Sequence, residues 1–160
     1  MAFRDTVERL RRERTEPMRS ADLVSAWRAE VSRLYDDIAE WLLPYTDDGG
    51  IQLERHAKAA SEESLGSYEI DQLDIVVGRE IVRLDPQGTM VIGARGRIDM
   101  SHLGSGDPRV LVLTGDEAAP AWHLVDRTSR TRLTPLTKES LEAALEGLLE
   151  EYGLRAGSAM

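Results

Sequence analysis

The sequence contains no cysteine, which excludes disulfide scaffolds, cysteine nucleophiles, zinc fingers and iron–sulfur sites. It also has no apolar run near the roughly 20 residues that a membrane-spanning helix requires. The start, Met1-Ala-Phe-Arg-Asp, has no apolar segment after its charges, so we expect no cleaved secretory signal. These absences predict a cytoplasmic location.

Positive charge comes almost entirely from arginine, because Lys58 and Lys138 are the only lysines. The chain of 160 residues carries a formal charge of −9, with 41% hydrophobic and 31% charged residues, which suits one acidic globular domain. The first 20 residues hold six arginines against four carboxylates, whereas residues 21–50 hold seven carboxylates against two arginines. Nonspecific nucleic-acid binding depends on cationic side chains that neutralise phosphates, so the overall charge disfavours it.

Two helices are predicted before any strand. Phe3, Val7 and Leu10 recur at the spacing of an amphipathic helix, which Pro17 is expected to end. A second helix of roughly 30 Å is predicted over residues 21–43 from a single apolar stripe. The stripe consists of Val24, Trp27, Val31, Leu34, Ile38 and Trp41.

The apolar pattern then changes from a helical period to alternation, which predicts β-strands as far as residue 133. Residues 51–60 suit either a strand or a helix. The parity of the alternation changes near Asp71, which predicts a β-bulge or a bend. Gly78-Arg79 supplies the glycine that a two-residue hairpin turn requires. The Asp-Pro-Gln-Gly sequence at 85–88 is expected to make the next reversal.

Thr137 is expected to cap a closing amphipathic helix that ends at Gly153. Hairpin-linked strands between helices, without β-α-β alternation, predict an α+β fold. In this fold an antiparallel, meander-like sheet of about five to seven strands is flanked by a long N-terminal helix and a C-terminal helix. The expected organisation is an arginine-rich helical segment over 1–19, a single domain over 20–153 and a disordered tail over 154–160.

Four arginines lie on consecutive expected strands: Arg79, Arg83, Arg95 and Arg97. Alternation could bring Arg95 and Arg97 to one face, and with Arg83 they would form a patch suited to a carboxylate or a phosphate. The alternative, which we favour, is a solvated face on which these arginines pair with nearby carboxylates. Those carboxylates are Glu80, Asp85 and Asp99.

No catalytic or metal-binding constellation stands out. Gly93-Ala94-Arg95-Gly96 is similar to the GXXG loop of KH domains, but that loop joins two helices and here both flanks have strand character. Two glycines within a strand favour a bulge or a close backbone approach. His56, His102 and His123 form no metal-ligand motif, so we expect no metal, no cofactor and no catalytic residue.

Segregated charge without a catalytic constellation favours a non-enzymatic protein-interaction or regulatory module. An acidic surface would attract a basic partner protein, as inhibitor-like or immunity-like proteins do. The residues expected to make this contact are Asp36, Asp37, Glu40, Asp47 and Asp48.

Three alternatives remain open at the level of sequence. Nucleic acid could bind through the N-terminal arginines and the hairpins from Arg79 to Arg97. A substrate or another small ligand could bind in a pocket between the sheet and the helices. Trp27 and Trp41 are expected to be core residues, but their helix could instead mediate self-association.

Overall fold

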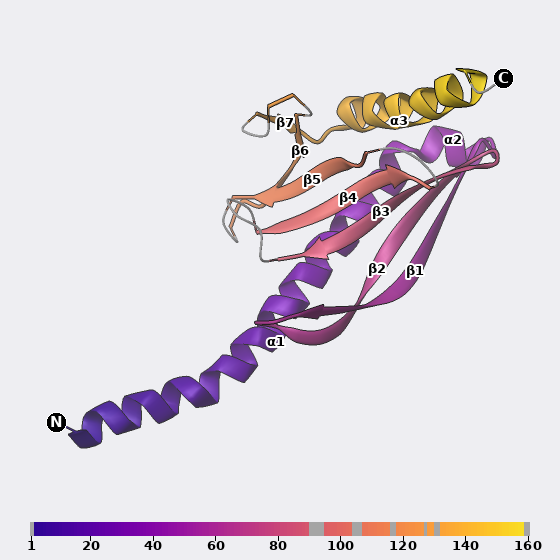
Figure 1. Cartoon of the computed structure of the whole chain (residues 1–160). Helices are drawn as coiled ribbons and strands as arrows, with labels where there is room; N and C mark the ends of the chain where they lie inside the picture. Colours follow the sequence, from indigo (N-terminus) through magenta and orange to yellow (C-terminus); the bar gives the residue numbers. More distant parts are fainter. Residues whose placement is uncertain are drawn as a thin grey trace.

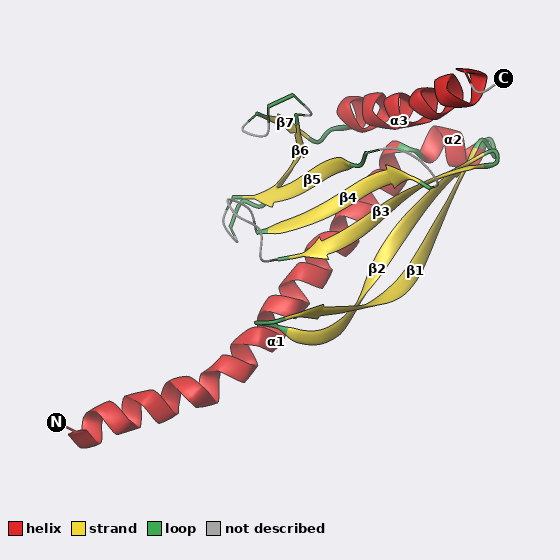
Figure 2. Cartoon of the chain, in the orientation of Figure 1, coloured by secondary structure: helices red, strands yellow, loops and turns green. Residues whose placement is uncertain are grey.

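The computed structural model describes residues 2–89, 95–103, 107–115, 118–126, 128–129 and 132–158, and over 13–19 and 152–158 it describes the backbone alone. The fold is α+β, with a seven-stranded antiparallel meander, N-terminal helices and a C-terminal helix, which confirms the predicted class (Figure 2). The elements are α1 (Ala2–Trp41), α2 (Leu43–Asp47), β1 (Ile51–Glu62), β2 (Gly66–Val77), β3 (Glu80–Gly88), β4 (Gly96–His102), β5 (Arg109–Thr114), β6 (Ala121–Val125), β7 (Leu133–Pro135) and α3 (Lys138–Ser158).

Neighbouring strands in the sheet are also neighbours in the chain, in the order β1 to β7. Residues 51–60, which the sequence leaves ambiguous, belong to β1 and pair with β2 along its full length. The two-residue turn between β2 and β3 lies at Gly78-Arg79 as predicted, and Gly78 has a φ of +62°. A positive φ costs little in glycine because it has no Cβ.

The hairpin of β1 and β2 bends instead of forming a bulge near Asp71. Its register runs without a shift from Ile51 opposite Val77 to Glu62 opposite Gly66. In Figure 1 the hairpin curves along its length, so both parities of β2 reach the protein interior. The change of parity in the sequence therefore marks a bend in a continuously paired strand.

The predicted reversal at residues 85–88 is wrong, because β3 continues to Gly88. Pro86 lies opposite Ile98 of β4, and the register shifts between Pro86 and Gly88. Proline has no N–H to donate to the ladder, and an irregularity at that point accommodates the missing hydrogen bond. The sequence also predicts one long strand from Met90 to Met100. Its residues 90–94 lie outside the described residues, and residues 96–100 belong to β4.

The predicted helix end at Pro17 is also wrong: α1 is one helix of 40 residues, about 60 Å long. An interior proline removes one backbone hydrogen bond and bends a helix without forcing the chain out of it. Figure 1 shows α1 changing direction between its N-terminal part and the part on the sheet. Among the described residues, none of the helices combines the length and the apolarity that a bilayer crossing needs.

The hydrophobic core lies on one face of the sheet, beneath α1 and α3. Trp27, Leu34 and Ile38 of α1 and Leu141 of α3 belong to one buried cluster with the inward-facing strand residues. Trp27 is 3% exposed, which confirms its predicted place in the core, and Trp41 is half-buried against the same cluster.

The closing helix begins as predicted. The backbone N–H of Ser140 donates to Thr137 Oγ1 at 3.2 Å, and the N–H of Thr137 donates to Ser140 Oγ at 2.7 Å. This reciprocal cap satisfies two N–H groups that the first turn leaves without helical partners. The predicted end at Gly153 is wrong, because the helix continues to Ser158. Glycine within a helix costs only about 1 kcal/mol relative to alanine, so it does not by itself end the helix.

Candidate functional site

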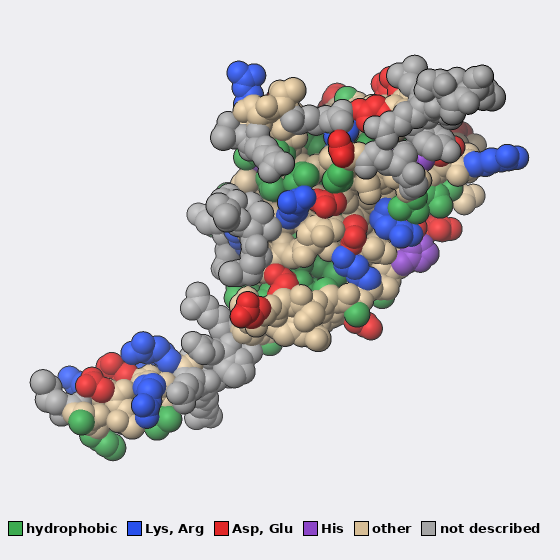
Figure 3. Space-filling view, in the orientation of Figure 1, with side chains coloured by type: hydrophobic (Ala, Val, Ile, Leu, Met, Phe, Trp, Pro, Cys, Tyr) green, Lys and Arg blue, Asp and Glu red, His purple; other side chains and the backbone are tan. Residues whose placement is uncertain are grey.

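The face of the sheet away from α1 carries a network of charged and polar side chains. Its members come from neighbouring strands because alternation and the strand register bring them to one side. Figure 3 shows this face, on which acidic and basic side chains are interspersed. We call it the charged sheet face and define it as Glu54, His56, Lys58, Gln72, Asp74, Arg83, Asp85, Arg97 and Asp99.

An ion pair between Arg83 and Asp74 lies at the centre of this face. Arg83 donates from Nε and Nη2 to the two oxygens of Asp74, at 2.7 and 2.9 Å. The side chain of Asp74 is 4% exposed, whereas that of Arg83 is 32% exposed. The hydrogen bonds to Asp74 raise the pKa of the Arg83 guanidinium, which stays charged.

The four arginines of the predicted patch do not form a free cationic surface. Arg97 donates to Asp99 at 2.8 Å, and Arg83 is held by Asp74. Arg79 is exposed in the β2–β3 turn, whereas Arg95 is half-buried just before β4. The charged sheet face holds four carboxylates against three cationic side chains. Such a balanced surface lacks the excess positive charge that nucleic-acid binding requires.

Asp85 connects β3 with both strands of the long hairpin. Its Oδ1 accepts hydrogen bonds from Lys58 Nζ and, at 3.1 Å, from Gln72 Nε2. Burial alone would raise the pKa of Asp85, but the hydrogen bonds from Lys58 and Gln72 outweigh it and lower the pKa below its usual value of 3.8. The ionised carboxylate therefore contributes to stability at neutral pH.

We expect Asp85→Asn to lower the free energy of unfolding at pH 7 by about 1 kcal/mol, because a third of the side chain is exposed and solvent screens the pair. The folded-state pKa lies below the unfolded one, so this stabilisation is present above about pH 3.8. It is lost as the pH falls through the pKa of Asp85 in the folded protein, and the variant and the wild type then differ less in free energy of unfolding. Urea denaturation between pH 7 and pH 3 measures this difference. The exposed Asp37→Asn is the control, and a gap that stays constant over this range would contradict the prediction.

Three side chains of this face, Glu54, His56 and Asp74, converge although the sequence predicts no metal-binding cluster. His56 Nε2 lies 3.3 Å from Asp74 Oδ2 and 3.6 Å from Glu54 Oε2. The three ligand atoms all lie within 4.8 Å of one another, so these residues could hold a metal ion. Glu54 and His56 share a face by alternation along β1, and Asp74 is the cross-strand neighbour of Glu54. The Glu-x-His spacing was visible in the sequence, but the third ligand follows only from the register.

The other two histidines lie elsewhere. His102 is 4% exposed and its Nε2 lies 2.6 Å from Glu80 Oε2. His123 Nδ1 lies 3.0 Å from Thr114 Oγ1, on neighbouring strands of the sheet.

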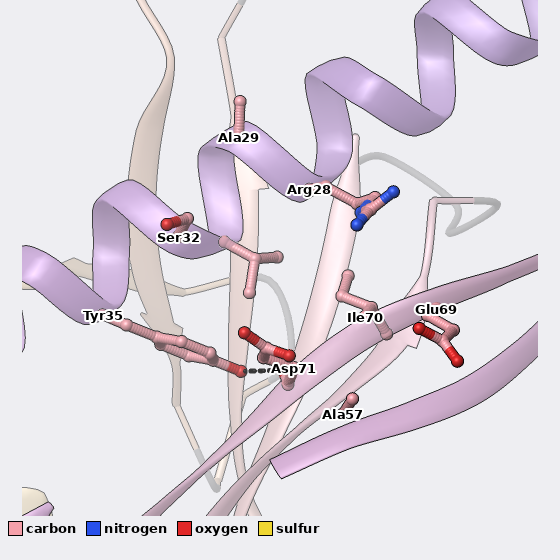
Figure 4. Close-up of a pocket in the computed structure, with 9 residues that line it drawn as sticks. Arg28, Ala29, Ser32, Tyr35, Ala57, Glu69, Ile70 and Asp71 are labelled. Atoms are coloured by element: carbon pink, nitrogen blue, oxygen red, sulfur yellow. Dashed lines mark hydrogen bonds between the residues drawn. The ribbon is translucent and has the colours of Figure 1, made fainter. Parts of the chain in front are cut away.

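A groove of about 320 Å³ lies between α1 and the β1–β2 hairpin. Small side chains, Ala29, Ser32 and Ala57, leave the space, and Figure 4 shows the residues around it. The buried hydroxyl of Tyr35 donates to the carbonyl oxygen of Asp71 at 2.7 Å. Burial raises the pKa of Tyr35 far above its usual value, so the hydroxyl is a neutral donor that already has its acceptor.

The five acidic residues predicted to bind a partner lie around the C-terminal end of α1 and in the short segment after it. All five are exposed. Asp36 pairs with Arg55 of β1 at 2.7 Å, and Asp48 Oδ1 accepts a hydrogen bond from the backbone N–H of Gly50. The region is therefore acidic and accessible, although part of its charge already has a partner.

The N-terminal part of α1 extends beyond the sheet (Figure 1). Residues 2–12 are all exposed. Ser20 contacts the body, because its hydroxyl donates a hydrogen bond to the carbonyl oxygen of Ser64 at 3.3 Å. We call residues 2–19 of α1 the N-terminal arm. Its apolar side chains Phe3, Val7 and Leu10 are 80%, 47% and 53% exposed.

Comparisons of the chain with protein-family models, with curated proteins and with solved structures found no match. Four surfaces of the described chain are functional candidates: the charged sheet face, the groove, the acidic region around the end of α1 and the N-terminal arm.

Proposed function

We propose that this protein is a non-enzymatic protein-interaction module, and that its N-terminal arm binds a helix of a partner protein. The observation that supports the proposal is the exposure of Phe3, Val7 and Leu10 at helical spacing on the arm. In the described body most large apolar residues belong to one buried cluster, and those that stay exposed are scattered over several elements: Leu23, Leu43, Tyr45, Leu103 and Leu133. Apolar side chains at this spacing form a stripe along one side of a helix, the arrangement by which amphipathic helices recognise one another.

The stripe on the arm does not continue the stripe that packs on the sheet. Phe3 belongs to the stripe on the arm, and Ile38 belongs to the stripe that packs on the sheet. Because each residue of a helix is rotated by about 100° from the one before it, these two residues lie about 100° apart around the helix axis. When the core stripe of α1 faces the sheet, the apolar stripe of the arm therefore faces a different direction around the helix. A partner helix can reach this side without displacing the core.

Charge on the arm indicates the chemistry of the partner. Arg4 and Arg11 are seven residues apart and flank the same edge of the apolar stripe. An antiparallel pairing of two arms would place these arginines opposite one another, and like charges at that position are unfavourable. A partner helix with carboxylates beside its apolar stripe is complementary. The negative body lies beyond a Debye length of about 8 Å from the tip of the arm, so salt screens its repulsion.

The acidic residues near the end of α1 support a second, separate contact for a basic segment of a partner. Asp36 lies about 50 Å along the helix from Phe3, so one small domain does not cover both surfaces. Two exposed apolar residues, Leu43 and Tyr45, lie in this acidic region, but they are two positions apart in the short helix α2 and do not form a stripe along one side. Exposed charges alone contribute little affinity. The arm is therefore the principal surface in the proposal.

Site-specific photo-crosslinking tests the arm. A photoreactive phenylalanine analogue at position 7, in cells that naturally make the protein, should crosslink to one partner protein. Mass spectrometry of the crosslinked peptide should show an apolar helical spacing with Asp or Glu beside it. The same probe at position 5, on the opposite side of the arm, should crosslink at least about tenfold less, because a helix presents one side to its partner.

Two further results decide between the alternatives. Val7→Glu should abolish the crosslink of a probe at position 3, because a buried charge in an apolar seam is costly. Equal crosslinking from positions 5 and 7 would contradict the proposal. An adduct with twice the mass of the chain would show that the arm pairs with a second copy, and this result would also overturn it.

A further inference from the structure

We propose that Glu54, His56 and Asp74 form a binding site for a divalent transition-metal ion, with Zn²⁺ as the preferred ion. The site lies on the charged sheet face, far from the N-terminal arm, and does not depend on the function proposed for the arm. It uses one imidazole nitrogen and two carboxylate oxygens, which are ordinary zinc ligands in proteins.

Two of the three distances between ligand atoms are close to those around a tetrahedral ion, and the third lies within 4.8 Å. Zinc bonds of about 2.05 Å in a tetrahedron separate each pair of ligand atoms by about 3.3 Å. His56 Nε2 lies 3.3 Å from Asp74 Oδ2 and 3.6 Å from Glu54 Oε2. An ion can therefore bind with small rotations of Glu54 and His56, which are 53% and 50% exposed and free of core packing.

Asp74 can bind a metal ion while it keeps its hydrogen bonds to Arg83. Each carboxylate oxygen has two lone pairs, and Arg83 uses one on each oxygen. The guanidinium thereby holds the nearly buried carboxylate in one orientation. Metal-ligating carboxylates are usually held by such outer hydrogen bonds, so Arg83 is a positioning residue of this site.

The local charge also favours a cation. Two carboxylates and one guanidinium leave a net charge of −1 around His56 in the described structure. The three protein ligands come from two adjacent strands, and the exposed side of the site leaves a fourth position for water. An imidazole with two carboxylates and an open position suits Zn²⁺ better than Mg²⁺, which prefers six oxygen ligands.

Zinc titration against a chromophoric chelator tests the site on the full chain. We expect one Zn²⁺ per chain in the wild type and at least about tenfold weaker binding in His56→Ala and in Glu54→Gln. Both side chains are exposed, so these variants should fold normally, which circular dichroism will verify. His123→Ala is the matched control, because it removes a histidine of the same sheet that lies outside the cluster, and it should bind zinc like the wild type.

Cobalt provides an independent readout, because tetrahedral Co²⁺ absorbs visible light much more strongly than octahedral Co²⁺. The wild type with Co²⁺ should show the strong tetrahedral spectrum, and His56→Ala should not. The proposal is overturned if the wild type withdraws no zinc from the chelator. It is equally overturned if His56→Ala binds zinc as tightly as the wild type, since the ion would then sit elsewhere.

Discussion

Replacing Gly96 with alanine is expected to lower the free energy of unfolding by about 3 kcal/mol, the upper end of the usual cost of overpacking a core. A Cβ at position 96 would lie 2.1 Å from Cζ3 of Trp27 and within 2.9 Å of two further ring atoms. The ring has little room to move, because it is buried and its centroid lies 6.0 Å from that of Trp122. Thermal denaturation should show a decrease in Tm of roughly 6–12 °C.

Two variants separate this clash from a general effect of losing a glycine. Gly147→Ala in α3 makes the same chemical change, but the new Cβ meets only the end of the flexible Arg109 side chain. Since alanine favours a helix over glycine, we expect this control to be neutral or slightly stabilising. In a Trp27→Leu background, Gly96→Ala should cost much less than in the wild type. A Gly96→Ala variant within about 0.5 kcal/mol of the wild type would contradict the prediction.

Arg83→Met is expected to lower the free energy of unfolding by about 2 kcal/mol. The variant removes both hydrogen bonds that Arg83 donates to the carboxylate of Asp74, whose side chain is 4% exposed. Removing one partner of a fully buried pair costs about 3–5 kcal/mol, and the partial exposure of Arg83 reduces this figure. Chemical denaturation in the presence of a metal chelator measures the loss without a cation replacing the guanidinium.

A second change should reverse most of this loss. In the double variant Asp74→Asn, Arg83→Met no buried charge remains, so its stability should exceed that of Arg83→Met alone. Arg79→Met in the exposed turn is the control and should change stability by less than about 0.5 kcal/mol. If Arg83→Met and Arg79→Met have equal effects, the ion pair of Arg83 contributes nothing to folding.

Much of the secondary structure was predictable because it follows from local spacing. The stripe that includes Trp27 and Ile38 can be buried on one side only as a helix, and the cap at Thr137 depends on a residue three positions away. Two of the errors involve proline. Pro17 and Pro86 each remove one backbone donor, but the surrounding helix and ladder supply enough other hydrogen bonds to continue through them.

Gly96 shows what a local sequence pattern can predict and what it cannot. Two glycines in a strand predicted a bulge or a close approach of another group, and at Gly96 the structure shows a close approach. The pattern does not name the approaching group. Trp27 is 69 positions away in the chain, and it reaches Gly96 because α1 crosses the sheet.

The candidate metal site was not predictable to the same degree. Glu54 and His56 share a face only if residues 51–60 are a strand, and the sequence left that choice open. Asp74 joins them through the pairing of β1 with β2, and Arg83 through the pairing of β2 with β3. The prediction of an arginine patch likewise depended on strand pairing, because the spacing of residues in the sequence could not show that Asp74 would hold Arg83.

The sequence by itself determined the class of fold, the absence of thiol chemistry, the acidic charge and the apolar stripes of the helices. These properties depend on composition or on neighbours within about one helical turn or one strand alternation. Only the tertiary structure decided which carboxylate meets which cation, which glycine faces a tryptophan and which apolar stripe stays exposed. Each of these depends on strand register and helix placement, which bring together residues that local spacing does not relate.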